Sequence, residues 1–219
     1  MAVTEEHCVL SKIIEPVKIL VLVSGGGSNL QALLDADLDG RISLVISDMS
    51  GAYAIERARL AGVPALLVKP DPGLPKPERR REHSDRILRI CRDKKIDLVV
   101  HAGFLSILAG DIIEEYSGRM INIHPALLPR YGGQGMYGER VHRAVLAAGE
   151  TESGCTVHLV DSEIDAGPVL LQRKVPVLPE DTVESLAKRV LGEEHIAIVE
   201  AVKMMIGRSN EKQGAYKRI

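Results

Sequence analysis

The sequence has 219 residues, 45% of them hydrophobic and 26% charged, values typical of a globular chain that buries a sizeable core. Its formal net charge is −2 with both signs interspersed, which argues against a basic face able to hold a nucleic-acid backbone. Aromatic residues make up only 3%, with no Trp and one Phe, so base-stacking platforms are also unsupported and we expect no nucleic-acid partner.

The chain opens with a strand, a turn and a helix. Residues 1–16 form a charged lead-in that ends at Pro16. Residues 17–23 are an almost continuous run of β-branched residues and leucine, which is typical of a parallel strand covered on both faces. A glycine-rich turn at 24–29 and a helical pattern at 30–34 follow. This order is the opening of a mononucleotide-binding βαβ unit.

Strands and helices continue to alternate. We expect strands at 42–47, 65–68, 97–101 and 120–123, and helices at 53–61 and 78–95. Such alternation predicts a single α/β domain with a doubly wound, mostly parallel sheet.

The amino-acid composition changes after Ile123. Residues 124–138 are rich in Pro, Gly and Tyr and predict a long exposed loop, followed by a helix at 139–148 and strands at 155–160 and 169–177. Asp181 is expected to cap a last helix, whose buried face would contain Leu186, Val190, Ile196, Val199 and Met204. We expect the domain to span 17–206 and residues 207–219 to form a frayed C-terminal tail.

The glycine-rich turn favours anion binding. Consecutive glycines (Gly25, Gly26, Gly27) let the backbone approach a phosphate, the next helix aims free N–H groups at it, and Ser28 and Asn29 add side-chain donors. The spacing matches neither GxGxxG nor GxxxxGK[ST], so a nicotinamide cofactor or nucleoside triphosphate is poorly supported. The alternative is a tight turn without a ligand.

Asn122 and His124 form the second candidate feature. They stand two residues apart at the end of a buried strand, so they point to the same side, where open α/β sheets bind ligands. An amide donor beside an imidazole suits an oxyanion that develops during acyl transfer. The alternative is that His124 only caps the strand end.

Acids in the connection at 161–168 form the third feature. Such residues are usually solvated in turns, but one carboxylate here could orient His124 and raise its pKa. The sequence leaves open which acid points inward, and also whether His158 faces the site or solvent.

Metal and serine chemistry lack support. The remaining histidines make no metal-ligand spacing with Cys or an acid, and HExxH and GxSxG are absent, so we expect no metal.

Taken together, these features resemble the glycinamide ribonucleotide transformylases, over roughly residues 17–205. The most specific stretches are SGGGSNLQALL at 24–34, HAGFLSIL at 101–108, INIHPALLPRYGG at 121–133 and TVHLVDSEIDAGP at 156–168. The resemblance implies a Rossmann-like formyltransferase fold and formyl transfer from 10-formyltetrahydrofolate to the amino group of glycinamide ribonucleotide, in de novo purine biosynthesis.

The resemblance also implies roles for individual residues. Asn122, His124 and Asp165 fall on the catalytic residues of the family. The turn from Gly25 to Asn29 falls on its substrate-phosphate site, and Glu194 on an acid that holds the substrate ribose. The folate pocket would be formed by Arg80, Leu105, Ser106, Ile107, Leu108, Val160 and Asp161. A phosphate-binding half would span about 17–118 and a folate-binding, catalytic half about 119–206. A homodimer is compatible with the family, and the sequence does not decide it.

Three departures from the family pattern stand out. Gly26 replaces an Asn found in many members, which removes a side chain near the phosphate but not the backbone cradle. Ser106 stands where some members carry Arg. The loop at 132–138 is longer than in the shortest members and is either a lid or a surface elaboration.

Related enzymes share parts of this pattern. Formyltetrahydrofolate hydrolases have the Asn-His-Asp core but carry an N-terminal regulatory domain, which we do not expect in the 16 residues before the first strand. Methionyl-tRNA formyltransferases add a C-terminal nucleic-acid-binding domain and lack this turn, and sugar-nucleotide formyltransferases are usually longer and differ at the first loop. A ligand-binding regulator without catalysis is the alternative outside enzymes, and the intact Asn-His-Asp set argues against it.

We expect a cytoplasmic protein without a membrane partner. Three scattered cysteines lack CxxC spacing, which indicates reduced thiols. No apolar stretch approaches membrane-spanning length, and the N-terminus carries acids where a signal peptide carries bases.

Overall fold

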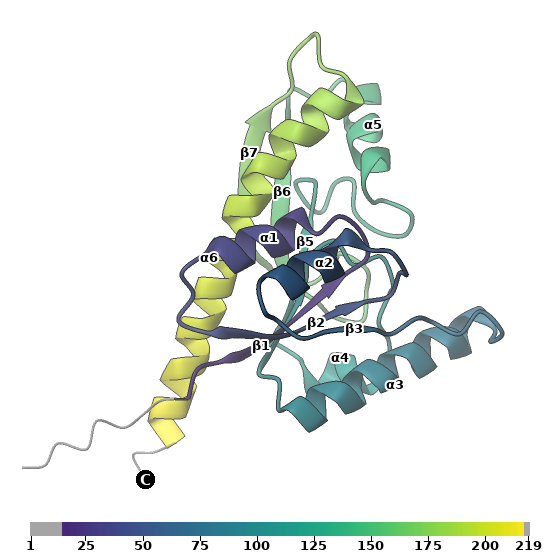
Figure 1. Ribbon diagram of the computed structural model, residues 1–219. Coiled ribbons are helices and arrows are strands. Elements are labelled where there is room, and N and C mark those ends of the chain that lie inside the picture. Colours follow the sequence, from purple (N-terminus) through teal and green to yellow (C-terminus); the bar gives the residue numbers. More distant parts are fainter. Residues whose placement is uncertain (1–14, 217–219) are drawn as a thin grey trace, which may run out of the picture.

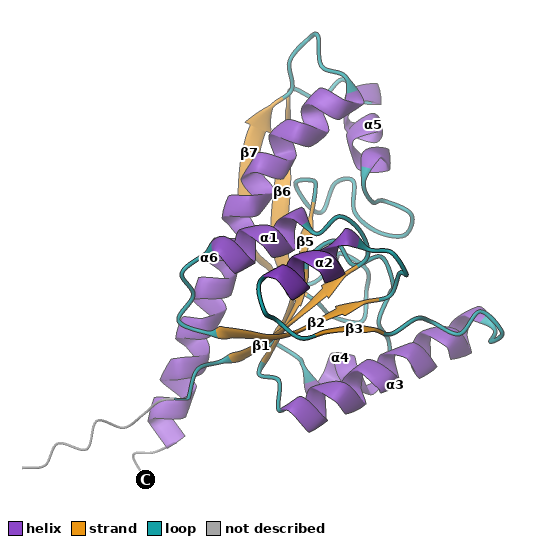
Figure 2. Ribbon diagram, viewed as in Figure 1, coloured by secondary structure: helices purple, strands orange, loops and turns teal. Residues whose placement is uncertain are grey.

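A computed structural model describes residues 15–216, so most of the predicted lead-in lies outside the described residues. The fold is one seven-stranded sheet in the order β3-β2-β1-β4-β5-β6-β7, with helices on both faces (Figures 1 and 2). The strands are β1 Lys18–Val23, β2 Arg41–Ser47, β3 Ala65–Leu67, β4 Leu98–His101, β5 Met120–His124, β6 Glu152–Leu159 and β7 Val169–Pro176.

Six helices connect or follow these strands. They are α1 Ser28–Asp35, α2 Tyr53–Leu60, α3 Lys76–Lys94, α4 Asp111–Glu115, α5 Glu139–Ala147 and α6 Val183–Tyr216. The sequence analysis missed α4, because five residues are too few to show a helical period. None of the helices in this described part is both long and apolar enough to cross a membrane.

The expected doubly wound, mostly parallel sheet is confirmed. Strands β1 to β5 pair in parallel, whereas β6 pairs antiparallel with β5, and β7 antiparallel with β6. The strand order reverses between β1 and β4, where connections leave to opposite faces. Ligands of open α/β sheets bind outside the carboxyl ends of the strands at such a switch point.

Alternate residues of β1 pack into two separate hydrophobic cores, one on each face of the sheet. Val21 and Val23 pack in a cluster with residues of α1, α2, α5 and α6, while Leu20 and Leu22 pack with residues of α3 and α4. Figure 1 shows α3 and α4 on one side of the sheet and α1 and α2 on the other. Because both faces are covered, the strand is apolar from Ile19 to Val23, as the run at 17–23 predicted.

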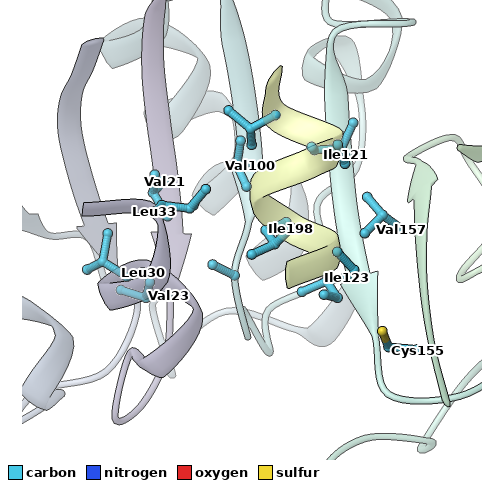
Figure 3. Packing of buried hydrophobic residues seen from close by; sticks show 14 of the residues in the cluster. Val21, Val23, Leu30, Leu33, Val100, Ile121, Ile123, Cys155, Val157 and Ile198 are labelled. Carbon is cyan, nitrogen blue, oxygen red and sulfur yellow. The ribbon is translucent and has the colours of Figure 1, made fainter. Parts of the chain in front are cut away.

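Helix α6 packs on the sheet through a different stripe from the one we predicted. Leu186 and Val190 are buried, but Ile196 and Met204 are 44% and 41% exposed, so those two assignments were wrong, and Val199 is only partly buried. The buried stripe instead continues through Ala197, Ile198, Ala201, Val202, Met205 and Ile206. Figure 3 shows Ile198 against β4 and β5, near Val100, Ile121 and Ile123.

Both ends of α6 also differ from expectation. Thr182, not Asp181, caps its N-terminus, since the Thr182 hydroxyl accepts a 3.2 Å hydrogen bond from the Ser185 amide. Asp181 instead accepts hydrogen bonds from the Arg189 guanidinium at 2.6 and 2.8 Å. The predicted tail at 207–219 is helical as far as Tyr216, which corrects the frayed assignment, and residues 217–219 lie outside the described residues.

Replacing Ile198 tests the packing of α6. Ile198 is fully buried, so Ile198→Ala should lower the free energy of unfolding by about 2–5 kcal/mol in urea titrations. Met204→Ala on the exposed side of the same helix should cost well under about 1 kcal/mol. Equal losses in the two variants would contradict this arrangement.

Candidate active site

A cavity of about 720 Å³ opens at the carboxyl ends of β4 and β5. Its walls are the segment after β4, the loop at 133–138, the loop at 160–165 and one side of α6. This volume suits a small-molecule ligand of cofactor size. The cavity adjoins the switch point of the sheet, where the topology predicts a ligand.

Most of the residues singled out from the sequence line this cavity. They are Asn29, Leu105, Ser106, Ile107, Leu108, Asn122, His124, Val160, Asp161, Asp165 and Glu194. Five others do not line it: Gly25, Gly26, Gly27, Ser28 and Arg80. The first four lie beside Asn29 at the start of α1, and Arg80 is half-buried on α3. The longer loop contributes Gly133 to Gly138 to the wall, so it faces the cavity rather than forming a surface elaboration.

The fold brings Asn122, His124 and Asp165 together. The Asp165 Oδ1 atom accepts a 3.4 Å hydrogen bond from the Asn122 amide, and its Oδ2 atom lies 3.5 Å from the Nδ1 atom of His124. Both partners project from the end of β5, as their spacing predicted. Among the acids of the 161–168 connection, Asp165 is therefore the one that reaches this pair.

Close packing of loops fixes Asp165. Its backbone is in the left-handed region at φ 56°, and its Oδ2 atom accepts a 2.9 Å hydrogen bond from the Gly133 amide. A Cβ atom at Gly132 would lie 2.5 Å from a Leu128 methyl carbon, and one at Gly167 would lie 1.9 Å from the Leu159 carbonyl oxygen. Glycine is therefore required at 167, and a side chain at 132 would have to displace the Leu128 methyl group.

His158 is a fourth member of this cluster, which the sequence analysis left undecided. It stands opposite Asn122 in the antiparallel β5–β6 pair, so both side chains share one face of the sheet. Its Nε2 atom lies 3.1 Å from the Asn122 amide nitrogen and 3.6 Å from Asp165 Oδ1, while Nδ1 donates to the Leu159 carbonyl oxygen at 2.8 Å. Only the register of β6 against β5 reveals this, because alternation along β6 cannot distinguish its two faces.

Burial sets the charge of His124. Removal from water lowers the pKa of His124 below its ordinary value, and the nearby Asp165 carboxylate offsets this only in part. The expected effect of an acid on the pKa of His124 is therefore present in Asp165, but burial outweighs it. Because the Nε2 atom of His124 lies 2.8 Å from the Tyr131 carbonyl oxygen, which can only accept, the neutral ring carries its hydrogen on Nε2 and presents an unprotonated Nδ1 to Asp165.

Asp165 itself stays ionised. Burial alone would raise the pKa of Asp165, but its contacts with the His158 ring, the His124 ring and the Gly133 amide together hold it below its ordinary value. An ionised carboxylate beside a neutral imidazole can accept a proton.

Asn29 and Glu194 both line the cavity and are joined to each other. The Asn29 amide donates a 2.7 Å hydrogen bond to Glu194 Oε2, and both side chains are buried. Burial raises the pKa of Glu194, and the hydrogen bond from Asn29 opposes that rise. The pair links α1 to α6 and leaves the second carboxylate oxygen for a ligand hydroxyl.

The turn before α1 exposes backbone donors. Among the residues that the structure describes, no side chain caps α1 and its first turn carries no acid, so none of them neutralises its N-terminal N–H groups. Gly27 has φ 71°, and a Cβ atom there would lie 2.6 Å from that of Ala54. Glycine is therefore needed for α2 to pack against the turn.

Hydrogen bonds anchor the segment after β4. The Leu105 amide donates to the Ser24 hydroxyl at 2.7 Å, and the Ala109 amide to the Ser84 hydroxyl at 2.9 Å. The Ser106 hydroxyl donates to the buried Asp48 carboxylate at 2.6 Å. These hydrogen bonds fix the path of the backbone at 105–108, which forms one wall of the cavity.

Among the residues that the structure describes, no group of three or more His, Cys, Asp or Glu side chains is placed to hold a metal.

Comparison with known proteins gives a consistent picture. The formyl transferase family profile matches residues 17–202. The phosphoribosylglycinamide formyltransferase of Haemophilus influenzae is 37% identical over 183 residues, covering 81% of this chain and 82% of that protein. The crystal structure of glycinamide ribonucleotide transformylase 1 from Symbiobacterium toebii superimposes with a TM-score of 0.80 at 39% identity, covering 88% of each chain.

Similar sequences also occur inside larger proteins. The trifunctional purine biosynthetic protein adenosine-3 of Drosophila melanogaster is 40% identical over 196 residues. That match covers 86% of this chain but only 14% of the fly protein.

Buried histidines should make the stability depend on pH. Burial, helped by His158, lowers the pKa of His101 to about 3, so the unfolded chain binds a proton below about pH 6.5 that the folded protein does not. Stability is therefore lost as the pH falls below this value. In urea titrations, wild type should lose about 2 kcal/mol more than His101→Asn between pH 7 and 5. Parallel losses in both proteins would contradict a neutral, buried His101.

Proposed function

The chain belongs to the formyl transferase family, and from this premise we propose that it transfers a formyl group from 10-formyltetrahydrofolate to the amino group of glycinamide ribonucleotide, in de novo purine biosynthesis. The names of the relatives support this substrate pair. The observation that carries the proposal is one cavity that has the Asn122–His124–Asp165 cluster in its wall and the Asn29–Glu194 pair at its end.

The ribonucleotide occupies the end of the cavity near α1. Its phosphate accepts hydrogen bonds from the N–H groups of the turn at 25–29, and the free Glu194 oxygen accepts from a ribose hydroxyl. The hydrogen bond from Asn29 to Glu194 supports this role because it aims the carboxylate at the same end. The proposed phosphate-binding half (17–118) and folate-binding half (119–206) thus share the substrate, since Glu194 comes from the second.

The folate lies along the anchored wall after β4. Backbone groups of Leu105 to Leu108, Val160 and Asp161 read the edges of the pterin, and Ser106 contributes through its backbone because its hydroxyl is bonded to Asp48. Arg80, which does not line the cavity, acts at the outer entrance. The loop at 133–138 covers the bound ligands from the opposite side as a lid.

The reaction requires the amine nitrogen to bond to the formyl carbon and the bond from that carbon to folate N10 to break. Negative charge develops on the formyl oxygen, which accepts a hydrogen bond from the Asn122 amide. The ionised Asp165 takes up the proton that the attacking amine loses, and this proton is passed through water to N10.

His124 responds to the developing charge. Because Nε2 is committed to Tyr131, the proton that the ring gains goes to Nδ1, which faces Asp165 and the substrates. A negative formyl oxygen near Nδ1 raises the pKa of His124, so the ring becomes a donor in the transition state rather than before it.

The proposal also covers the cellular location, the co-substrate and the oligomeric state of the enzyme. We place the reaction in the cytoplasm, which is supported by the buried free thiols of Cys91 and Cys155. The co-substrate is 10-formyltetrahydrofolate, the chemistry needs no metal, and a homodimer stays a prediction.

The decisive assay follows the absorbance of folate deformylation with and without glycinamide ribonucleotide. We expect turnover only when the ribonucleotide is present, because its amine is the acceptor. Turnover without it would identify a formyltetrahydrofolate hydrolase. Absence of turnover under both conditions would refute catalysis of this reaction.

The variant Asp165→Asn serves as the matched control for chemistry. It keeps the shape of the side chain but cannot accept a proton, so kcat should fall by roughly 100-fold or more. The KM values of both substrates should stay within about threefold, because Asp165 acts on the reacting atoms rather than on the phosphate or pterin. Near-normal kcat would remove Asp165 from the mechanism.

A further inference from the structure

We propose that Arg57 of α2 supplies the positive charge that binds the substrate phosphate at the glycine-rich turn. This inference rests on the proposed function and adds to it a residue that the sequence motifs did not indicate.

Arg57 is attached directly to the turn. Its Nε atom donates a 2.8 Å hydrogen bond to the Gly26 carbonyl oxygen, and Nη1 donates to the Gln31 side chain on α1 at 2.9 Å. The guanidinium also lies over the Tyr53 ring, 5.0 Å from its centre. Figure 1 shows α1 and α2 side by side, so the guanidinium bridges two neighbouring helices.

These contacts leave part of the guanidinium available. Among the described side chains and backbone, nothing accepts a hydrogen bond from Nη2 of Arg57. Arginine binds phosphate through just such planar N–H groups, and its charge does not titrate near neutral pH. The bond to the Gly26 carbonyl oxygen also restrains the orientation of that one peptide group.

The site needs a cation at this point. The turn itself is uncharged, and Gly26 contributes no side chain. Five carboxylates line the cavity (Glu139, Asp161, Glu163, Asp165 and Glu194) against one lysine, Lys188. A phosphate with close to two negative charges would be repelled by this field unless a positive group stood beside it.

His195 on α6 lies close enough to Arg57 to be affected by its charge. Burial lowers the pKa of His195, and the positive charge of Arg57 lowers it further. His195 directly follows Glu194, the proposed ribose contact, and its Nε2 atom is buried without a hydrogen-bond partner. The guanidinium therefore lies near the part of α6 that carries Glu194.

Lys188 is the competing cation. It lies on α6 six residues before Glu194, which corresponds to roughly 9 Å along a helix axis. It is exposed, and among the described residues no hydrogen bond or ion pair joins it to the turn. Arg57, in contrast, is hydrogen-bonded to the turn itself, so the geometry favours Arg57.

The experiment compares binding of glycinamide ribonucleotide with binding of its dephosphorylated riboside, by NMR titrations that reach millimolar affinities. Arg57→Gln should weaken ribonucleotide binding by roughly 10- to 100-fold, the loss typical of one charge-assisted contact, and leave riboside binding within about twofold. Arg57→Lys should recover part of the loss. Arg59→Gln, on the same helix in an exposed pair with Glu56, should bind both ligands as wild type does.

Two outcomes would overturn the inference. Equal weakening for both ligands in Arg57→Gln would show that the residue only supports the fold of the turn. A phosphate-specific loss in Lys188→Gln, with none in Arg57→Gln, would assign the phosphate to Lys188. Because these titrations measure binding, they remain decisive even if the proposed formyl transfer is not observed.

Discussion

The site depends on one constraint, the position of the Asp165 carboxylate. Three parts of the chain hold it: Asn122 on β5, His158 on β6 and the Gly133 amide in the loop before α5. These parts meet only when β6 pairs antiparallel with β5 and the loop at 126–133 packs against the loop at 160–167. The reactive cluster is therefore a consequence of the completed fold.

Burial and charge act in opposite directions at this cluster. Removal from water favours a neutral His124, whereas the neighbouring carboxylate favours the imidazolium, and burial prevails. The Tyr131 carbonyl then determines which nitrogen of the neutral ring is protonated. A ring that is neutral at rest and poised to gain a proton on Nδ1 becomes a stronger donor when negative charge develops beside it, which is the moment at which catalysis requires it.

The sequence predicted local features well and long-range ones poorly. The strand, turn and helix at 17–34 were predictable because glycines and an apolar run leave few conformations, and the common direction of Asn122 and His124 follows from strand geometry alone. His158 and Arg57 could not be placed, because their roles depend on strand register and helix packing between distant segments. Ile196 and Met204 were misassigned because apolar residues on α6 occur on both of its faces.

Nitrogen NMR of the His124 ring tests most directly whether burial, rather than Asp165, sets its charge. At pH 7 the ligand-free protein should show a neutral ring with its hydrogen on Nε2 and a pKa below about 6.5. In Asp165→Asn this pKa should fall further, because the charge that raises it is gone. A doubly protonated ring at pH 7 in the wild type, or a pKa that rises in the variant, would contradict the account.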